Sequence, residues 1–316
     1  MLLNNLKKLY RIFFIKLKRF IYPESYYTDA LFAALYHKVH DLESSFEIIP
    51  KSTKEAFNTQ WIELPKGKGL LSDSWFRENV SKILTKEELL IEPFWFKNKS
   101  VLDAGCGNGR WSYAFSKLGS NITCVDANLS ALEQTKKEIS IFNNKQNFIH
   151  SDLEDIQNFL EPESFDLVFC WGVLHHCKSF NKSLKNISRL LRKGGIIYLY
   201  LYGKESSSFE EEINLFKERL RYNVLLDKDQ RRKFLLSKTR GNIDKLHIAH
   251  DNFAPLINRR FSFKEISKKL YDLGYEDIQK TIEHSEVFVR ATKGKSLHKK
   301  YFLNKNKPPY WFQKMK

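Results

Sequence analysis

The stretch Val101-Leu102-Asp103-Ala104-Gly105-Cys106-Gly107-Asn108-Gly109-Arg110 decides the fold of this chain. An apolar run that ends on a carboxylate predicts a buried strand, and three glycines at alternate positions predict a tight turn. The residues from Trp111 onward follow a helical pattern. A dinucleotide-binding turn needs the spacing Gly-x-Gly-x-x-Gly, but here the third glycine comes one residue early. The sequence therefore predicts a strand, a glycine turn and a helix, and the glycine spacing differs from that of a dinucleotide site.

Four further strand-like segments follow in order. Residues 121–126 form a β-branched run that ends on Asp126, about twenty residues past the turn, where an α/β nucleotide-binding fold places a carboxylate on ribose hydroxyls. Residues 147–153 repeat the strand-then-acid pattern, and residues 165–176 end on two histidines. Residues 190–199 comprise a basic helix end, two glycines and a buried-type strand. Five such units predict a doubly wound α/β sheet.

The form Asp103-x-Gly-x-Gly-x-Gly, with these units over residues 99–203, resembles the class I S-adenosylmethionine (SAM)-dependent methyltransferases. The resemblance implies a seven-stranded, mostly parallel sheet with a reversed terminal hairpin, and SAM as cofactor. It places Asp126 on the ribose and Asp152 on the adenine amino group. The cofactor-binding residues that it implies are Asp103, Gly105, Cys106, Gly107, Gly109, Asp126, Ala127, Asp152, Leu153, Cys170, Trp171, Val173 and Trp61.

The acidic residues also have structural alternatives. Asp126 can be an ordinary strand-end cap, and Asp152 can be the N-cap of a following helix. We expect Asp103 to organise the turn by accepting backbone N–H bonds rather than to take part in chemistry. Asp166 begins a strand, far from the edge at which open α/β sheets bind ligands, so we expect it to be structural.

Composition and motifs divide the chain into six expected segments. In chain order they are a basic amphipathic helix (1–22), a helical N-terminal covering segment (23–98), the SAM-binding core (99–203), a helical insertion that covers the substrate (204–260), the last helix and terminal β-hairpin of the core (261–293), and a basic aromatic tail (294–316). Within the covering segment, Trp61 and Trp75 can present aromatic faces to the sulfonium of SAM or serve as core residues.

The net charge of +16 is concentrated at the two ends of the chain. Residues 1–20 contain six lysines and arginines without an acid, and residues 291–316 contain eight lysines without an acid. The region between them is nearly neutral. The four cysteines show no CxxC pairing, so we expect reduced thiols and no metal site. We find no apolar stretch of membrane-spanning length and no signal peptide, and the composition suits a soluble cytoplasmic enzyme.

Both ends suggest contact with an anionic surface. Residues 1–20 place leucines and phenylalanines on one helical face and basic residues on the other, which favours a membrane-surface helix; the alternative is that this face packs on the enzyme body. The tail interleaves aromatic residues, including Tyr301 and Phe302, with lysines, a pattern that suits an anionic interface or nucleic acid.

Methyl transfer depends mainly on alignment, and an oxygen or nitrogen acceptor of high pKa also benefits from a general base. His176, just past the fourth strand, is the first candidate, although paired histidines at the start of a helix are often structural. His250 is the second, because Asp251 can orient its ring. Tyr202, at the end of the fifth strand, is the third.

The leading hypothesis is a SAM-dependent methyltransferase that modifies an oxygen or nitrogen of a small molecule, a surface sugar or a lipid-linked intermediate. It would be cytoplasmic, with peripheral membrane contact through residues 1–20. One alternative is an RNA (tRNA or rRNA) methyltransferase whose basic tails bind phosphates. Another is a SAM-binding protein with different chemistry. Confinement of the charge to the tails favours a small-molecule acceptor over nucleic acid.

Overall fold

A computed structural model of the chain describes residues 48–64, 70–206, 208–225 and 227–304. The amphipathic helix expected at residues 1–22 and the end of the tail from residue 305 lie outside the described residues. Among the helices in the described ranges, none has the length and apolar character needed to span a bilayer.

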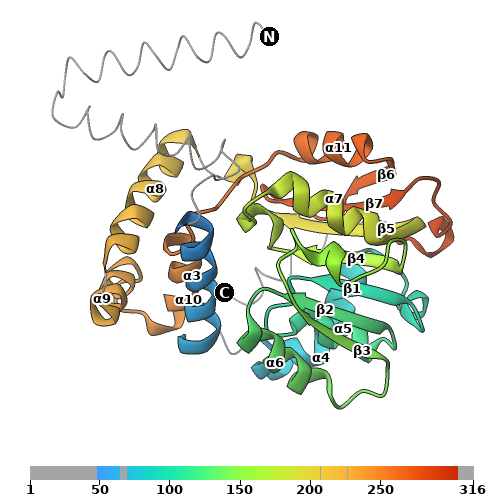
Figure 1. Ribbon diagram of the computed structural model, residues 1–316, viewed down its shortest axis with the longest axis horizontal. Coiled ribbons are helices and arrows are strands. Elements are labelled where there is room, and N and C mark those ends of the chain that lie inside the picture. Colours follow the sequence, from blue (N-terminus) through green and yellow to red (C-terminus); the bar gives the residue numbers. More distant parts are fainter. Residues whose placement is uncertain (1–47, 65–69, 207, 226, 305–316) are drawn as a thin grey trace, which may run out of the picture.

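Seven strands form one sheet in the order β3-β2-β1-β4-β5-β7-β6 (Figure 1). β1 to β5 run parallel, and β7 lies antiparallel between β5 and β6. The strands are β1 (Ser100–Ala104), β2 (Asn121–Asp126), β3 (Gln146–His150), β4 (Phe165–Trp171), β5 (Leu191–Leu201), β6 (Tyr275–Lys280) and β7 (Val287–Lys293). The predicted fold class, a mostly parallel doubly wound sheet with a reversed end, is confirmed.

The register brings the polar strand ends to one edge of the sheet. Asp126 pairs with His150 between β2 and β3, and Trp171 pairs with Tyr200 between β4 and β5. The strand order reverses between β1 and β4, and the glycine turn follows β1 at that point. Open α/β sheets bind ligands in the crevice at such a switch point, beyond the carboxyl ends of the strands.

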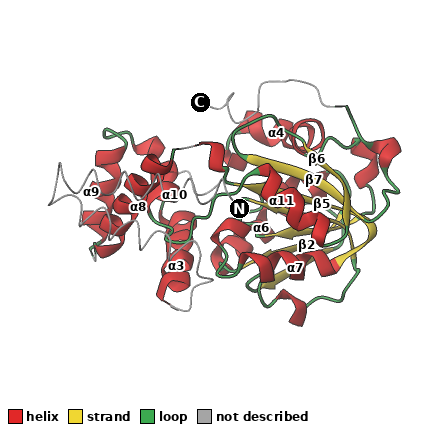
Figure 2. Cartoon of the chain, turned by 90° about the horizontal axis from the view of Figure 1, so that it is seen from above, coloured by secondary structure: helices red, strands yellow, loops and turns green. Residues whose placement is uncertain are grey.

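Helices cover both faces of the sheet, because successive strand residues point to opposite faces. α4 (Ser74–Ile83), α5 (Arg110–Lys117) and α6 (Leu129–Ile139) pack over one apolar cluster. α7 (Phe180–Leu190) and α11 (Phe263–Asp272) pack over the other. Figure 2 shows α6, α7 and α11 against the sheet from above. The core is therefore a three-layer sandwich.

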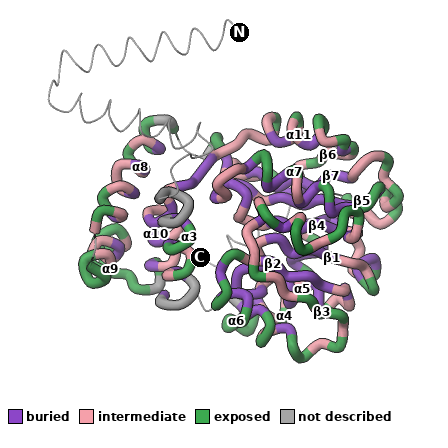
Figure 3. Tube along the Cα trace, in the orientation of Figure 1, coloured by how far each residue is buried: buried purple, intermediate pink, exposed green. Residues whose placement is uncertain are grey.

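A second group of helices stands beside the carboxyl edge of the sheet rather than on a face (Figures 1 and 2). Its members are α3 (Ile48–Glu63), α8 (Phe209–Val224), α9 (Lys228–Lys238) and α10 (Leu246–Phe253). They share a small apolar core that includes Ala56, Tyr222, Leu235 and Leu246. In Figure 3 α9 is coloured mainly as exposed, whereas α8 alternates between buried, intermediate and exposed residues. We call this group the helical cover.

The start of the expected basic tail packs on the body. Phe302 forms a β-bridge with Ile91, and the guanidinium of the buried Arg290 lies 3.8 Å from the centre of its ring. Tyr301 contacts Phe94 edge to face at 5.4 Å between centroids. Within the described residues, these two aromatic rings therefore act as packing residues.

Candidate functional site at the carboxyl edge

The glycine turn has the backbone that its sequence predicts. Gly105, Gly107 and Gly109 have φ of 85°, 54° and 86°, a region that favours glycine. A Cβ on Gly105 would lie 2.3 Å from Val173 Cγ2, and one on Gly109 would lie 3.0 Å from Cα of Thr135 in α6. Two of the glycines are thus required by close packing of the protein itself, which the sequence pattern did not indicate.

Asp126 holds the turn from the end of β2. Its Oδ2 accepts the N–H of Gly107 and its Oδ1 accepts the N–H of Asn128, each at 2.8 Å. Burial raises the pKa of this carboxyl, and the two N–H bonds oppose that rise. A carboxylate has about four acceptor positions, so both oxygens can still accept ribose hydroxyls. Asp126 therefore caps the end of β2 and holds the turn, and its role toward the ribose stays a prediction.

Asp103 lies beneath the turn and is 1% exposed. Its carboxyl accepts bonds from the backbone N–H of Ser112 and, at 2.6 Å, from the hydroxyl of the same residue. Burial raises the pKa of Asp103 to about 7. As expected, Asp103 accepts a backbone N–H. The donor, however, is Ser112 in the first turn of α5 and not a residue of the glycine turn, so Asp103 joins β1 to α5.

The residues after β3 contact the helical cover. Asp152 forms an ion pair with Lys54 of α3, with 2.6 Å between Nζ of Lys54 and Oδ2 of Asp152. Because both side chains of this ion pair are partly exposed, it contributes little stability. The Asp152 carboxylate can therefore exchange Lys54 for another hydrogen-bond donor.

The other residues near the end of β3 contact the body of the protein. The ring Nε2 of His150 donates to the carbonyl of the exposed Ala127 at 3.1 Å. Leu153 is buried in the core.

Two candidate residues at the end of β4 point to different faces. Cys170 is fully buried among apolar side chains, and this burial raises the pKa of its thiol, so the thiol does not face the edge. Trp171 donates from Nε1 to Glu88 at 3.3 Å and packs on Tyr200 at 4.3 Å between centroids. Cys106 in the turn is also buried. Glu88, which no sequence motif indicates, orients the Trp171 indole.

His176 is held in one tautomer. Its Nδ1 lies 2.7 Å from the carbonyl oxygen of Ile257. Because a carbonyl only accepts, the proton must lie on Nδ1, and Nε2 carries a lone pair. Burial lowers the pKa of His176 to about 3, so the ring is neutral near pH 7. Phe57 of α3 covers the ring edge to face at 4.8 Å. The neutral ring can accept a proton on Nε2, but its low pKa makes it a weak base.

Tyr202 lies beside the histidine pair and reaches the helical cover. Its ring centroid is 4.1 Å from that of His175 and 5.5 Å from that of His176. Its hydroxyl donates to Asp251 of α10. Burial raises the pKa of both Tyr202 and Asp251, so the phenol keeps its proton at neutral pH. The hydrogen bond joins the end of β5 to the cover.

The structure separates His250 from the other two candidates. His250 is 1% exposed, and neither ring nitrogen has a hydrogen-bond partner in the described part of the chain. Its ring packs on Tyr222 of α8 at 5.8 Å. Asp251, which we expected to orient this imidazole, bonds to Tyr202 instead. His176 and Tyr202 thus lie together at the sheet edge, whereas His250 belongs to the interior of the cover.

Helix α3 contacts residues that follow β2, β3 and β4 at this edge, and no sequence motif indicates these contacts. Asn58 accepts from Asn128 beside Asp126 at 3.0 Å, and Gln60 Nε2 lies 3.1 Å from Nε2 of His247 in α10. Trp61 also belongs to α3, but its side chain lies outside the described part of the structure. A helical pattern predicts that α3 exists, while its place over the site depends on tertiary packing.

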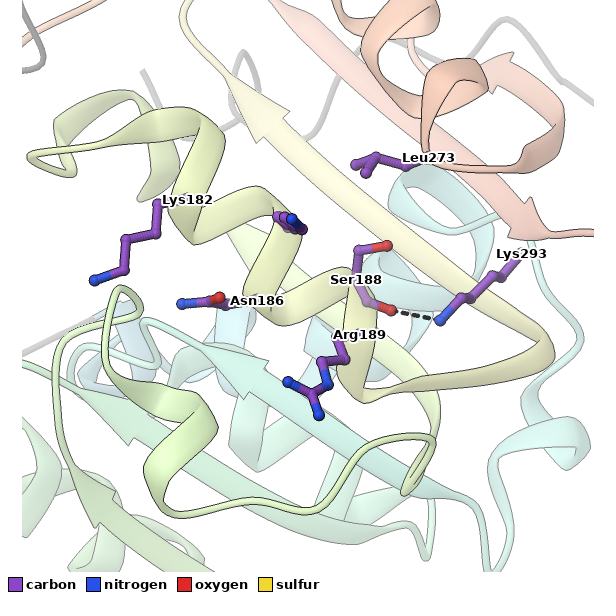
Figure 4. A pocket seen from close by; sticks show the side chains of 7 residues that line it. Lys182, Asn186, Ser188, Arg189, Leu273 and Lys293 are labelled. Atoms are coloured by element: carbon purple, nitrogen blue, oxygen red, sulfur yellow. Dashed lines mark hydrogen bonds between the residues drawn. The ribbon is translucent and has the colours of Figure 1, made fainter.

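A surface depression on α7 lies away from this edge (Figure 4). Its lining residues are Lys182, Lys185, Asn186, Ser188, Arg189, Leu273 and Lys293. The charged ends of Lys182 and Arg189 point in different directions, and Lys293 donates to two backbone carbonyls at 2.8 and 2.9 Å. These cations do not converge on one ligand position, so we assign no function to the depression.

Comparison with known proteins shows which of them the central region of the chain resembles. Residues 102–199 match the sequence model of a family described as methyltransferase domain. A mitochondrial ubiquinone biosynthesis O-methyltransferase of Schizosaccharomyces pombe is 32% identical over 124 residues, which cover 38% of this chain and 44% of that protein. A malonyl-[acyl-carrier protein] O-methyltransferase of Buchnera aphidicola is 27% identical over 179 residues, which cover 56% and 64%. The chain thus spans about half to two thirds of these relatives.

Solved structures of methyltransferases also match this chain. One is the 1,6-didemethyltoxoflavin N1-methyltransferase of Burkholderia thailandensis with bound S-adenosylhomocysteine, at 16% identity and a TM-score of 0.47, covering 78% of this chain and 91% of that one.

Proposed function

We propose that this chain, whose residues 102–199 form a class I SAM-dependent methyltransferase domain, transfers a methyl group from SAM to an oxygen atom of a small-molecule acceptor. The observation that carries the proposal is the pairing of two features at one sheet edge. The first is a glycine turn held by Asp126. The second is a neutral His176 whose proton is fixed on Nδ1. The glycine turn would bind the nucleoside of the cofactor, and His176 would accept the proton of an acceptor hydroxyl.

The residues at the edge fit SAM. Asp126 would accept the ribose hydroxyls, since each of its oxygens uses one acceptor position on a backbone N–H. Asp152 would accept the adenine amino group once Lys54 moves aside or shares the carboxylate. When bound, SAM supplies a methyl group already activated by its positively charged sulfur. Phe57 and the rest of α3 would exclude water from this region.

On the acceptor side, Nε2 of His176 would take the proton of the acceptor hydroxyl as the oxygen attacks the methyl carbon. The hydrogen bond from Nδ1 to Ile257 keeps the ring oriented during that transfer. Tyr202, whose hydroxyl proton is donated to Asp251, would position the acceptor through its ring and the lone pairs of its phenol oxygen. His250 has no role in this proposal because it packs in the cover.

Two observations support an oxygen of a small molecule among the acceptors considered. Both relatives reported above are O-methyltransferases by name. The aromatic residues Tyr301 and Phe302, which would serve an RNA-binding tail, pack on the body instead. We keep a cytoplasmic enzyme with peripheral membrane contact through residues 1–20 as part of the proposal, and this part rests on the sequence pattern alone.

Two measurements test the proposed function. Calorimetry should show that the purified chain binds S-adenosylhomocysteine and not NAD. Radiolabelled SAM and a metabolite extract should then yield a labelled small molecule, whose methyl position mass spectrometry identifies. Binding of NAD alone would overturn the cofactor assignment. A label found on nitrogen or on RNA would overturn the assignment of an oxygen acceptor on a small molecule.

A further inference from the structure

We infer that the acceptor carries its hydroxyl on an aromatic ring, and that this ring lies against the exposed edge of Tyr200 at the end of β5. The inference rests on the proposed function, because it concerns the acceptor of the same reaction. It narrows that acceptor from any small-molecule hydroxyl to a phenol.

The first observation is a ladder of aromatic side chains across the centre of the sheet. Phe169 pairs with Tyr198 and Trp171 pairs with Tyr200 between β4 and β5, and Tyr200 pairs with Phe288 between β5 and β7. Because residues two apart in a strand share a face, these rings lie on one face of the sheet. The first pair is fully buried, whereas Trp171 and Tyr200 are partly exposed. The ladder therefore reaches the surface at the carboxyl edge.

The second observation concerns which part of Tyr200 is available. Its ring centroid lies 4.6 Å from that of Phe288, at an interplanar angle of 17°, and 4.3 Å from that of Trp171, at 38°. These neighbours belong to strands on opposite sides of β5, so they occupy both faces of the ring. The partly exposed part is thus the ring edge with its hydroxyl, which forms no hydrogen bond within the described residues. A positive aromatic edge attracts the negative face of another ring, and the hydroxyl can bind a polar substituent on that ring.

The third observation is the link from this edge to the proposed base. The ring centroid of Tyr202 lies 6.0 Å from that of Tyr200 and 5.5 Å from that of His176, and both contacts are edge to face. Phe57 of α3 packs on His176 from the helical cover. An acceptor ring held against Tyr200 is therefore separated from the imidazole by one tyrosine ring, and its surroundings are aromatic throughout.

The acidity of the hydroxyl supports the same class of acceptor. A phenol, like the tyrosine side chain, has a pKa of about 10, whereas an aliphatic hydroxyl resembles water, whose pKa is about 15.7. Burial lowers the pKa of His176 to about 3, so this weak base is better matched to the more acidic hydroxyl. As the phenol oxygen bonds to the methyl carbon, its proton passes to Nε2 of His176. The bond between the methyl carbon and the sulfur breaks, and its electron pair stays on the sulfur.

Two probes with the same carbon skeleton test the aromatic contact. With S-adenosylhomocysteine bound, equilibrium dialysis should show that the chain binds 2-naphthol about 3- to 10-fold more tightly than decahydro-2-naphthol, its saturated counterpart. Equal affinity for the two probes would overturn the inference. Radiolabelled SAM and a metabolite extract should yield the methyl ether of a phenol. A label on an aliphatic hydroxyl would overturn this inference and leave the proposed transfer to oxygen in place.

Substitutions at Tyr200 separate its ring from its hydroxyl. Tyr200→Leu removes both, so the preference for 2-naphthol over decahydro-2-naphthol should fall below about twofold. Tyr200→Phe removes only the hydroxyl, so both probes should bind more weakly while the preference stays at about 3- to 10-fold. Neither change should alter the affinity for S-adenosylhomocysteine by more than about twofold.

Tyr275 provides the matched control, because it is also a tyrosine of this sheet and is 1% exposed. It begins β6 and pairs with Lys293 at the end of β7, which places it at the opposite edge of the sheet. Tyr275→Leu should cost stability and leave the preference unchanged. A preference that survives Tyr200→Leu, or that is lost equally in Tyr275→Leu, would overturn the role of Tyr200. Failure of the wild-type chain to bind S-adenosylhomocysteine would instead overturn the proposed function and, with it, this inference.

Discussion

The carboxylate of Asp126 accepts the backbone N–H of Gly107 at 2.8 Å, so the end of β2 holds the middle of the glycine turn. Two features that the sequence presents nineteen residues apart are therefore one unit. A change at either residue should alter both the shape of the turn and its capacity to bind a nucleoside.

Asp126→Ala should weaken S-adenosylhomocysteine binding by about 1.5–3 kcal/mol through lost charge-assisted bonds. It should also lower the melting temperature, since Gly107 and Asn128 lose their acceptor. Asp166, the second residue of β4, provides the control, because it accepts the N–H of Ser100 at 2.8 Å. Asp166→Ala should cost stability alone. Calorimetry and thermal unfolding separate the two effects, and equal affinity loss in both variants would contradict the ribose role of Asp126.

Gly105→Ala should destabilise the fold, because the new Cβ would lie 2.3 Å from Val173 Cγ2. Adding Val173→Ala removes that methyl and should restore part of the lost free energy of unfolding. A residual cost of about 1–3 kcal/mol should remain, since the backbone at φ 85° disfavours any side chain. Denaturant unfolding of the two single variants and the double variant measures the coupling. If the changes in the free energy of unfolding of the two single variants simply add up in the double variant, the contact with Val173 is not the reason for glycine at position 105.

Gly107→Val tests the turn as the cofactor cradle. The residue has φ of 54° and donates to Asp126, so a β-branched side chain should strain the turn and abolish S-adenosylhomocysteine binding. The rest of the sheet should still unfold cooperatively in a thermal scan. Normal binding with an unchanged melting temperature would mean that the turn does not hold the cofactor.

His176→Gln should lower kcat by about 100- to 10,000-fold, the usual contribution of a general base, while S-adenosylhomocysteine affinity stays within about twofold. His298→Gln is the control, because this histidine accepts a bond from Trp95 and packs with the C-terminal segment. It should leave kcat unchanged. Single-turnover rates with the acceptor identified from the extract provide the measurement, and a small effect at His176 would favour catalysis by alignment alone.

His176 should also make stability depend on pH. Its pKa is about 3 in the folded chain and about 6.5 when exposed, so the unfolded state binds a proton between these values and the folded state does not. The contribution of the neutral ring is therefore complete above pH 6.5 and is lost as the pH falls. From pH 7 to pH 5, the stability advantage of the wild type over His176→Gln should shrink by about 2 kcal/mol. Urea unfolding at both pH values tests this, and a constant difference would contradict the burial of a neutral ring.

Residues 1–20 can be tested by deletion. If this segment lies on a membrane, attraction to anionic lipid should contribute about 1 kcal/mol for each well-placed lysine or arginine. The truncated chain should then no longer sediment with phosphatidylserine vesicles but should keep its S-adenosylhomocysteine affinity. An insoluble truncated chain, or one without cooperative unfolding, would indicate that the segment packs on the enzyme body.

The sequence alone determined the sheet and the place of Asp126 beside the glycine turn. Strand, turn and helix signals are local, and the alternation of apolar runs with helical patterns leaves few arrangements other than a doubly wound sheet. The carboxyl ends of parallel strands must meet at one edge, so placing Asp126 beside the glycine turn required no knowledge of distant contacts.

Tertiary structure alone decided which of the three candidate catalytic residues lie together. The sequence offers both His176 and His250 as candidate bases, yet one lies at the sheet edge and the other packs on Tyr222 inside the cover. Asp251 bonds to Tyr202, forty-nine residues away, rather than to its neighbour His250. These outcomes depend on how α3 and the insertion dock against the edge. The surfaces that dock come from segments far apart in the chain, and no local pattern encodes which of their polar groups will meet.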